Sequence, residues 1–208
     1  MTMKGKFIVV EGLEGAGKST AIAYVKQLLQ QHGHDVVCTR EPGGTPMAER
    51  LRDLVKQVAN DEIVAPQTEL LLMYAARMQL VSNVIQPALT AGRWVLADRH
   101  DMSSRAYQGG GRMLDEVFIN QLRQAVLGDL TPDLTLYLDI DPTIGLERAR
   151  ARGELDRIEQ EKLDFFVRTR EKYLTIAMSE PNIVVVDASQ SIKQVQQQLH
   201  AALQQVFS

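Results

Sequence analysis

The sequence predicts an α/β fold in which a parallel sheet of five strands has helices on both faces. Short apolar runs rich in β-branched residues alternate with segments of helical periodicity along the 208 residues. These runs are largely apolar, as expected of strands buried on both sides. The length fits one domain, and no linker-like composition divides the chain. Residues 1–208 are therefore expected to form a single domain.

Five predicted strands define the sheet. Each apolar run is four or five residues long and is followed by a turn signal or a charged residue. The predicted strands span residues 7–10, 35–39, 94–97, 134–138 and 183–186.

Helical spacing of apolar residues predicts the segments between the strands. A first helix begins at about Gly17, a second at about Pro46, and a third runs from Pro66 to about Leu89 with an interruption or kink at Pro87. A closing helix follows the last strand. The expected inward positions are Ile22, Val25, Leu28 and Leu29, then Leu51, Leu54, Val55 and Val58, and finally Ile192, Val195, Leu199, Ala202 and Val206.

A phosphate-binding motif lies between the first strand and the first helix. Residues 12–19 match G-x-x-x-x-G-K-[ST], and their position at a strand-to-helix turn is the one that this motif requires. Backbone N–H groups and the helix dipole would hold the phosphates, Lys18 would reach the β- and γ-phosphates, and the Ser19 hydroxyl would hold a divalent cation. The alternative is a glycine-rich turn that binds nothing. We expect a fold of the P-loop NTPase type that binds a nucleoside triphosphate through Gly12, Leu13, Glu14, Gly15, Ala16, Gly17, Lys18, Ser19 and Thr20.

Charged residues follow four of the apolar strands, and ligands bind at this edge of a parallel sheet. Simple solvated loop charges would explain one such strand end more easily than four. The residues are Glu11, Arg40 and Glu41, Asp98 and Arg99, and Asp139.

Composition gives expectations about location and partners. The net charge of −3 offers no basic surface for nucleic acid or an anionic membrane. No apolar run approaches the roughly 20 residues that span a bilayer, and none resembles a signal-peptide core. The only cysteine, Cys38, fits a reducing compartment and is expected to be a small buried side chain. We expect a cytoplasmic protein with no nucleic-acid or membrane partner.

Further motifs make the chain similar to a known family. They are FIVVEG at 7–12, TREPGGT at 39–45, YAAR at 74–77, DRH at 98–100, AYQG at 106–109, PDLTLYLD at 132–139 and the charged run 148–159. Together with the P-loop, they resemble the bacterial thymidylate kinases over essentially the whole chain. The resemblance implies transfer of the γ-phosphate of ATP to dTMP, giving dTDP, with Mg²⁺, in a homodimer. The apolar segment 70–85 is the expected partner surface, its alternative being a fully buried core helix.

The resemblance also implies roles for individual residues. Lys18, Arg99 and Arg152 would be catalytic, and Asp98 would order the magnesium ion together with Ser19. An unpaired Arg77 in a mostly apolar stretch would be costly to bury, so it has either a ligand or a structural carboxylate partner. The substrate-binding positions by resemblance are Glu41, Arg52, Met73, Arg77, Arg99, Ser103, Ser104, Tyr107 and Gln108.

One residue departs from the pattern of the family. Many relatives have a phenylalanine four residues before the helix arginine, where this chain has Met73. A thioether can contact a base, so Met73 is either a base contact or ordinary helix core.

The P-loop has Glu14 where some thymidylate kinases carry a basic residue, which resembles the bacterial type with arginines in a lid. The lid would span about 142–158, and Arg148 and Arg152 would share a helix face because they are four residues apart. We expect Arg152 to supply most of the charge that stabilises the transition state. A solvated charged helix is the alternative. The candidate arginines are Arg148, Arg150, Arg152 and Arg157.

Two other functions are alternatives to this reaction. A deoxynucleoside kinase acting on thymidine would share the P-loop and use Glu41 as a base, but a neutral acceptor needs fewer arginines. A GTPase switch would carry an N-K-x-D motif, which this chain lacks. For dTMP no base is needed, because a phosphate monoester with a second pKa of about 6 is already largely a dianion.

Overall fold

A parallel sheet forms the centre of the computed structural model, which describes residues 5–57, 62–151, 153 and 155–207. Within these ranges the sheet has five strands in the order β2-β3-β1-β4-β5. Every neighbouring pair is parallel, and Val9 of the central strand is paired with Ala97 on one side and Thr135 on the other. The predicted fold class is confirmed. The strands are β1 (Phe7–Gly12), β2 (Val36–Arg40), β3 (Trp94–Asp98), β4 (Leu134–Asp139) and β5 (Ile183–Asp187).

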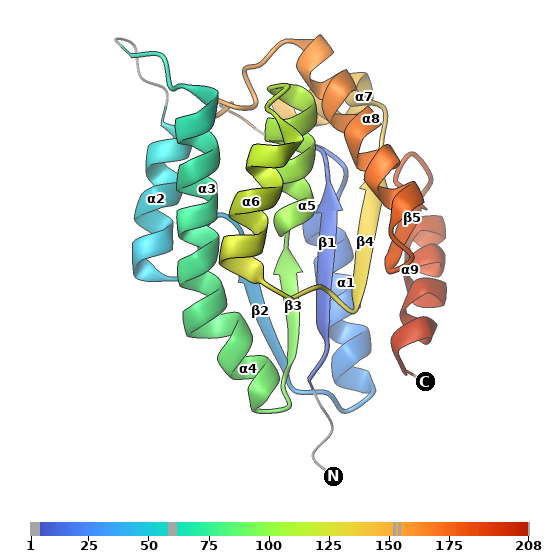
Figure 1. Ribbon diagram of the computed structural model, residues 1–208. Helices are drawn as coiled ribbons and strands as arrows, with labels where there is room; N and C mark the ends of the chain where they lie inside the picture. Colours follow the sequence, from blue (N-terminus) through green and yellow to red (C-terminus); the bar gives the residue numbers. More distant parts are fainter. Residues whose placement is uncertain (1–4, 58–61, 152, 154, 208) are drawn as a thin grey trace.

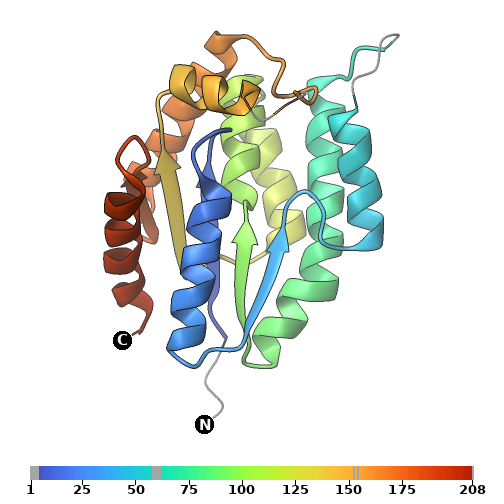
Figure 2. The ribbon, with the colours of Figure 1, turned by 180° about the vertical axis from the view of Figure 1, so that it is seen from behind.

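Helices cover both faces of the sheet. Helices α3, α4, α6 and α8 lie in front of it in Figure 1, and the view from behind in Figure 2 shows α1 and α9 on the other face. Helix α2 packs outside α3, beyond the β2 end of the sheet. The bounds are α1 (Lys18–Gln31), α2 (Pro46–Lys56), α3 (Pro66–Leu80), the π-helix η1 (Val81–Ile85), α4 (Gln86–Thr90), α5 (Asp101–Ser104), the π-helix η2 (Arg105–Gly111), α6 (Glu116–Leu127), α7 (Pro142–Arg150), α8 (Leu163–Ser179) and α9 (Ile192–Phe207).

The alternation of side chains along β1 explains why residues 7–10 of this strand are all apolar. Ile8 and Val10 pack into the cluster that contains Val25 of α1. Phe7 and Val9 point to the opposite face and pack with residues of η1, α4 and α6. Both faces are buried, so these four positions favour apolar side chains, and Glu11 at the end of the strand is buried only with hydrogen-bond partners.

Three expectations about burial were wrong. Cys38 is exposed, because β2 is an edge strand and its outward side chains are only partly covered. Leu54 is also exposed, because α2 buries only Ala48 and Val55. Ile192 is exposed at the first residue of α9, before the buried stripe of that helix begins. Val58, which was expected on the inner face of α2, lies outside the described residues.

The predicted interruption of the third helix is confirmed, and it is a widened turn. The π-helix η1 ends two residues before Pro87, and the Gln86 N–H donates to the Val81 carbonyl, five residues earlier. Proline has no N–H to donate, so the regular α-helical ladder cannot continue unchanged through this turn. The helical path resumes in α4 and ends at Thr90.

Candidate active site

A cavity of about 520 Å³ opens at the C-terminal edge of the sheet, next to the P-loop. This is the edge at which the charged strand ends were expected to meet. The predicted residues that line the cavity are Glu14, Gly15, Gly17, Lys18, Ser19, Thr20, Glu41, Arg52, Met73, Arg77, Asp98, Arg99, Ser103, Ser104, Tyr107, Gln108 and Arg148.

Other predicted residues lie elsewhere. Gly12, Leu13 and Ala16 are buried behind the P-loop surface. Arg152 lies outside the described residues, so its expected role has no structural counterpart here. Residues lining the cavity that the sequence did not single out are Pro42, Val55, Lys56, His100, Asp156, Ile158 and Glu159.

The P-loop turns into α1 through glycines in the left-handed region. Gly17 caps the helix with φ of 85°, and Gly15 has φ of 73°. A Cβ on Gly15 would lie 2.1 Å from the Gly145 carbonyl oxygen, so only glycine allows this approach to α7. Ser19 and Thr20, in the first turn of α1, are exposed at the cavity. The loop therefore presents free helix N-terminal groups to an anion.

The Lys18 ammonium folds back onto the loop itself. It donates to the carbonyl oxygens of Gly12 at 3.0 Å and Leu13 at 2.8 Å. Burial lowers the pKa of Lys18 to about 8, and the nearby Arg99 guanidinium acts in the same direction. An added phosphate would favour the protonated form of this lysine.

Arg99 bridges the acceptor side of the cavity and the P-loop. Its guanidinium donates to Glu14 at 2.8 Å and to the Tyr107 hydroxyl at 3.2 Å. The residue has φ of 70°, which is rare for a side chain of this size, and its N–H is held by the Val10 carbonyl at 2.9 Å. Tyr107 in turn donates to Glu14 at 2.7 Å. Arg99 is thus fixed by both its backbone and its side chain.

Arg77 has the carboxylate partner that was one of the two alternatives for it. Its Nε donates to Glu41 at 2.7 Å, and one Nη donates to Ser104 at 2.9 Å. The other, Nη1, is buried and has no hydrogen-bond partner among the described residues. The side chain also lines the cavity, so the structural partner does not use all of its donors.

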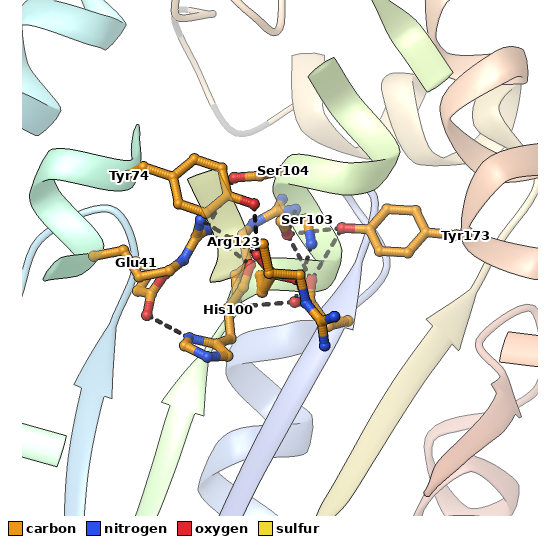
Figure 3. A network of polar contacts seen from close by, with 11 residues as sticks. Glu41, Tyr74, His100, Ser103, Ser104, Arg123 and Tyr173 are labelled. Atoms are coloured by element: carbon orange, nitrogen blue, oxygen red, sulfur yellow. Dashed lines mark hydrogen bonds and ion pairs between the residues drawn. The ribbon is translucent and has the colours of Figure 1, made fainter. Parts of the chain in front are cut away.

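Glu41 and His100 lie together at one end of the polar network in Figure 3, where the ring Nδ1 is 2.6 Å from the carboxylate. Burial alone would raise the pKa of Glu41, but His100 and Arg77 outweigh it and hold that pKa below its usual range. The carboxylate therefore stays ionised between two cationic or donating side chains. The Glu41–Pro42 peptide bond is cis.

The other end of this network centres on Glu11, which is fully buried. Its carboxylate accepts from the His100 N–H at 2.8 Å, the Ser103 hydroxyl at 2.5 Å and the Tyr173 hydroxyl at 3.0 Å. Ser103 and Tyr173 meet in Figure 3. Burial raises the pKa of Glu11. Glu11 was recognised as a strand end, whereas Tyr173 comes from α8 and no local sequence signal points to it.

Asp98 offers the chemistry of a magnesium ligand. Its Oδ1 is buried and has no hydrogen-bond partner in the described part of the chain, and it lines the cavity with the Ser19 hydroxyl. Across the described ranges, no three His, Cys, Asp or Glu side chains cluster as a metal site. One carboxylate and one hydroxyl fit Mg²⁺, which keeps several waters and takes other ligands from phosphates.

The candidate arginines of the lid have different partners in the structure. Arg148 on α7 points to the P-loop, where it is 3.4 Å from the Gly15 carbonyl oxygen. Helix α7 ends at Arg150, and the expectation that Arg148 and Arg152 share a helix face involves a residue outside the described ranges. Arg157 was also expected in the lid, but it is bound to Glu69 at 2.6 Å and to the Val55 carbonyl at 2.9 Å. Neither Arg150 nor Arg157 lines the cavity.

Met73 has the core packing that was one of its two alternatives, and its contact with a base stays a prediction. It is half-buried, packs against the main hydrophobic cluster and also lines the cavity. Its thioether is therefore available to a ligand while its stem belongs to the core.

In the described ranges, no helix is long and apolar enough to pass through a bilayer.

A P-loop beside an arginine-rich acceptor cavity, on a five-stranded parallel sheet, defines a P-loop kinase. The thymidylate kinase family model matches residues 10–199. The chain belongs to the thymidylate kinase family.

Individual relatives agree with this assignment. The chain is 59% identical over 207 residues to a thymidylate kinase of Vibrio parahaemolyticus, covering 99% of each chain. It is 60% identical over 203 residues to one of Idiomarina loihiensis, covering 98% of each. The crystal structure of thymidylate kinase from Ehrlichia chaffeensis has a TM-score of 0.77 at 30% identity and covers 97% of this chain and 99% of that one.

Proposed function

We propose that this protein transfers the γ-phosphate of ATP to dTMP, giving dTDP and ADP. Its membership of the thymidylate kinase family supports this reaction. The observation that carries the choice of acceptor is a pair of buried atoms without hydrogen-bond partners among the described residues, Arg77 Nη1 and Gln108 Oε1. Arg77 Nη1 has Asp101 at an ion-pair distance of 3.8 Å, which is too long for a hydrogen bond. Buried polar atoms normally have partners, so these two fit a ligand in the cavity that their residues line.

The two atoms match one edge of thymine. Arg77 offers a donor and Gln108 an acceptor, which is the complement of the O4 acceptor and the N3–H donor of that base. Cytosine has the reverse order, with an amino donor at C4 and an acceptor at N3, and would leave both protein atoms unpaired. Such mismatches in a buried site discriminate strongly. We therefore assign the base pocket to Arg77 and Gln108, with Ser104 and Met73 beside them.

Catalysis in this site depends on alignment and charge. The dTMP phosphate is already a dianion and needs no base, so the protein has to bring two anions together. Arg99 and Arg52 would hold the acceptor phosphate, and Lys18 would move from the loop carbonyls to the β- and γ-phosphates. Ser103 and Tyr107 would position the sugar.

Mg²⁺ is assigned to Ser19 and Asp98. When bound, it would screen charge on the transferring phosphoryl group. The unpartnered Oδ1 of Asp98 supports this assignment. Asp98 also lowers the free energy of the charged form of Lys18, so both groups act on the same phosphates.

The lid, about 142–158, is proposed to complete the donor site. Arg157 is bound to Glu69, and Arg150 does not line the cavity. The remaining candidates are Arg148, which contacts the Gly15 carbonyl of the P-loop, and Arg152. We retain Arg152 as the main source of transition-state charge. Arg152→Ala should lower kcat more than it raises KM for dTMP, and an unchanged kcat would contradict this role.

Thymidine phosphorylation with Glu41 as base is disfavoured by the geometry. The carboxylate is bound by Arg77 and His100, and its pKa is held low. A base that must accept a proton from a hydroxyl would be poorly served by such neighbours.

A homodimer is proposed through α2, α3 and α6, which lie side by side in Figure 1. Each carries exposed large apolar side chains, including Leu54, Leu71, Met78 and Val117. Helix α3 is thus not a fully buried core helix: Leu70 and Tyr74 face inward while Leu71 and Met78 face out. A monomeric mass in solution at micromolar protein would reject the dimer. We also propose a cytoplasmic location, supported by the single cysteine.

The first experiment is ADP formation from ATP and Mg²⁺ with thymidine, dTMP, dUMP, dCMP and dAMP offered separately. We expect strong turnover with dTMP and little with dCMP. Turnover with thymidine but not with dTMP would overturn the proposal and make Glu41 the catalytic base.

A further inference from the structure

Glu69 is a fully buried carboxylate that the reaction described above does not use. It lies in the first turn of α3 and is 0% exposed. Three side chains from other parts of the chain donate to it: Gln108 Nε2 at 2.8 Å, Arg112 Nη2 at 3.0 Å and Arg157 Nη2 at 2.6 Å. Burial alone would raise its pKa, but Arg112 and the other donors hold it below the usual range. The Glu69 carboxylate is therefore ionised and accepts hydrogen bonds from all three side chains.

The bond from Gln108 to Glu69 fixes the orientation of the Gln108 amide. An ionised carboxylate can only accept hydrogen bonds, so the amide nitrogen of Gln108 must face it. The amide oxygen is then directed away from Glu69, and it is this oxygen that has no partner among the described residues. Gln108 is 1% exposed and lines the cavity.

Backbone packing leaves Gln108 little other freedom. It lies in the π-helix η2, where Gly111 is so close to α8 that a Cβ would lie 2.5 Å from the Phe165 ring. The Gln108 carbonyl also accepts from the Leu114 N–H at 3.0 Å. Because the backbone is fixed, only the orientation of the Gln108 side-chain amide can still vary, and the hydrogen bond to Glu69 determines that orientation.

We propose that Glu69 is a positioning residue that makes Gln108 a hydrogen-bond acceptor in the base pocket and so sets the preference for thymine over cytosine. This inference rests on the proposed function and deepens it. Glu69 does not touch the cavity itself. It acts through Gln108, and its bond to Arg157 joins the same carboxylate to the end of the proposed lid segment.

Replacing the carboxylate by an amide tests the mechanism. In Glu69→Gln the two arginines would claim the carbonyl oxygen of residue 69, leaving its amide hydrogens towards Gln108. Gln108 would then turn its own oxygen inward and present an amide donor to the cavity, which suits N3 of cytosine. We expect the ratio of kcat/KM for dTMP to that for dCMP to fall about tenfold, the size of one buried hydrogen bond. KM for ATP should change little.

The matched control is Glu161→Gln. Glu161 is bound to Arg112 at the outer end of the same cluster but does not contact Gln108. The Glu161→Gln substitution removes one negative charge from the cluster, and we expect the ratio of kcat/KM for dTMP to that for dCMP to stay as in the unmodified protein. An equal fall in both variants would mean a charge effect and would overturn the proposal. Glu69→Asp keeps the negative charge, but its shorter side chain moves the carboxylate away from Gln108. This variant replaces Glu69→Gln in the test if Glu69→Gln fails to fold.

Coupling to Gln108 separates positioning from a purely structural role. In a Gln108→Ala background, Glu69→Gln should cause almost no further loss of base selectivity, because the group through which it acts is gone. Additive losses would contradict the proposal. The proposed function is tested separately by the unmodified protein: if that protein shows no preference for dTMP, the base pocket assignment itself fails. If it prefers dTMP and Glu69→Gln retains the full preference, only the inference about Glu69 fails.

Discussion

The Arg99 guanidinium is bound to the Glu14 carboxylate at 2.8 Å, and this pair joins the end of β3 directly to the P-loop. Both side chains are largely buried, and Tyr107 contacts both of them. In the proposed reaction, a phosphate bound by Arg99 would therefore lie in a site already joined to the P-loop. The pair links the two halves of the cavity that must be aligned for in-line transfer.

Arg99→Lys should lower kcat/KM for dTMP about 100-fold or more. A lysine keeps the charge but cannot contact Glu14, Tyr107 and a phosphate at the same time, because it lacks the planar fork of donors. Steady-state kinetics with dTMP varied at saturating ATP would measure this. Arg93→Lys is the control, since Arg93 forms an exposed pair with Asp35 far from the cavity. Equal kinetics for the two variants would remove Arg99 from the site.

Nucleotide binding should weaken as the pH rises through about 8. Lys18 has its pKa lowered to about 8 in the free protein, so its charge is lost across this range. Tyr107 and Tyr173 do not titrate here, because burial raises their pKa values well above normal. Kd for ATP, measured by calorimetry at pH 7 and pH 9, should increase for the unmodified protein. In Lys18→Arg the charge persists, and a similar increase there would assign the effect to another group.

Asp98→Asn should raise the Mg²⁺ concentration needed for half-maximal activity about tenfold. The amide keeps the shape but removes the charge that favours a hard cation. A titration of activity with Mg²⁺ at fixed ATP gives the value, and excess Mg²⁺ should restore part of kcat. Asp129→Asn changes an exposed carboxylate beyond α6 and should leave the titration unchanged. An unaltered Mg²⁺ requirement in Asp98→Asn would contradict the assignment.

Glu41→Gln should destabilise the fold. It removes the charge that partners Arg77 and His100, all three being buried, and breaking such a pair costs about 3 kcal/mol. For a chain of this size, Tm should fall by roughly 6–12 °C. Because the Glu41 pKa is held low, its contribution is present above the ordinary pKa of a glutamate and is lost as pH falls through the lowered value. Asp35→Asn breaks an exposed pair instead, and its Tm should stay within about 2 °C.

Local signals were sufficient to predict the sheet, the P-loop and the charged strand ends. A few neighbouring residues are enough to recognise the glycine motif, the apolar strands and the charged pair Asp98-Arg99. The ends of parallel strands then meet at one edge of the sheet as a consequence of the fold. The interruption at Pro87 was equally local, since it follows from a missing N–H.

Partners that depend on the tertiary fold could not be predicted. Arg157 lies in the charged run that was expected to form the lid, but it is bound to Glu69, a residue 88 positions earlier in the chain. Cys38 was placed inside because its run is apolar, yet the order of strands puts β2 at an edge. Periodicity shows that a helix has an apolar face, and the neighbouring helices decide how much of it is covered, as Leu54 shows.

The contact between Gly15 and Gly145 makes these two positions a matched pair. A Cβ on Gly15 would strike the Gly145 carbonyl, and a Cβ on Gly145 would lie 2.6 Å from the Glu14 carbonyl oxygen. Backbone therefore meets backbone between the P-loop and α7, with no side chain to yield. A side chain added at either glycine would force the P-loop and the first turn of α7 apart, so each of these two positions restricts the residue that the other can tolerate.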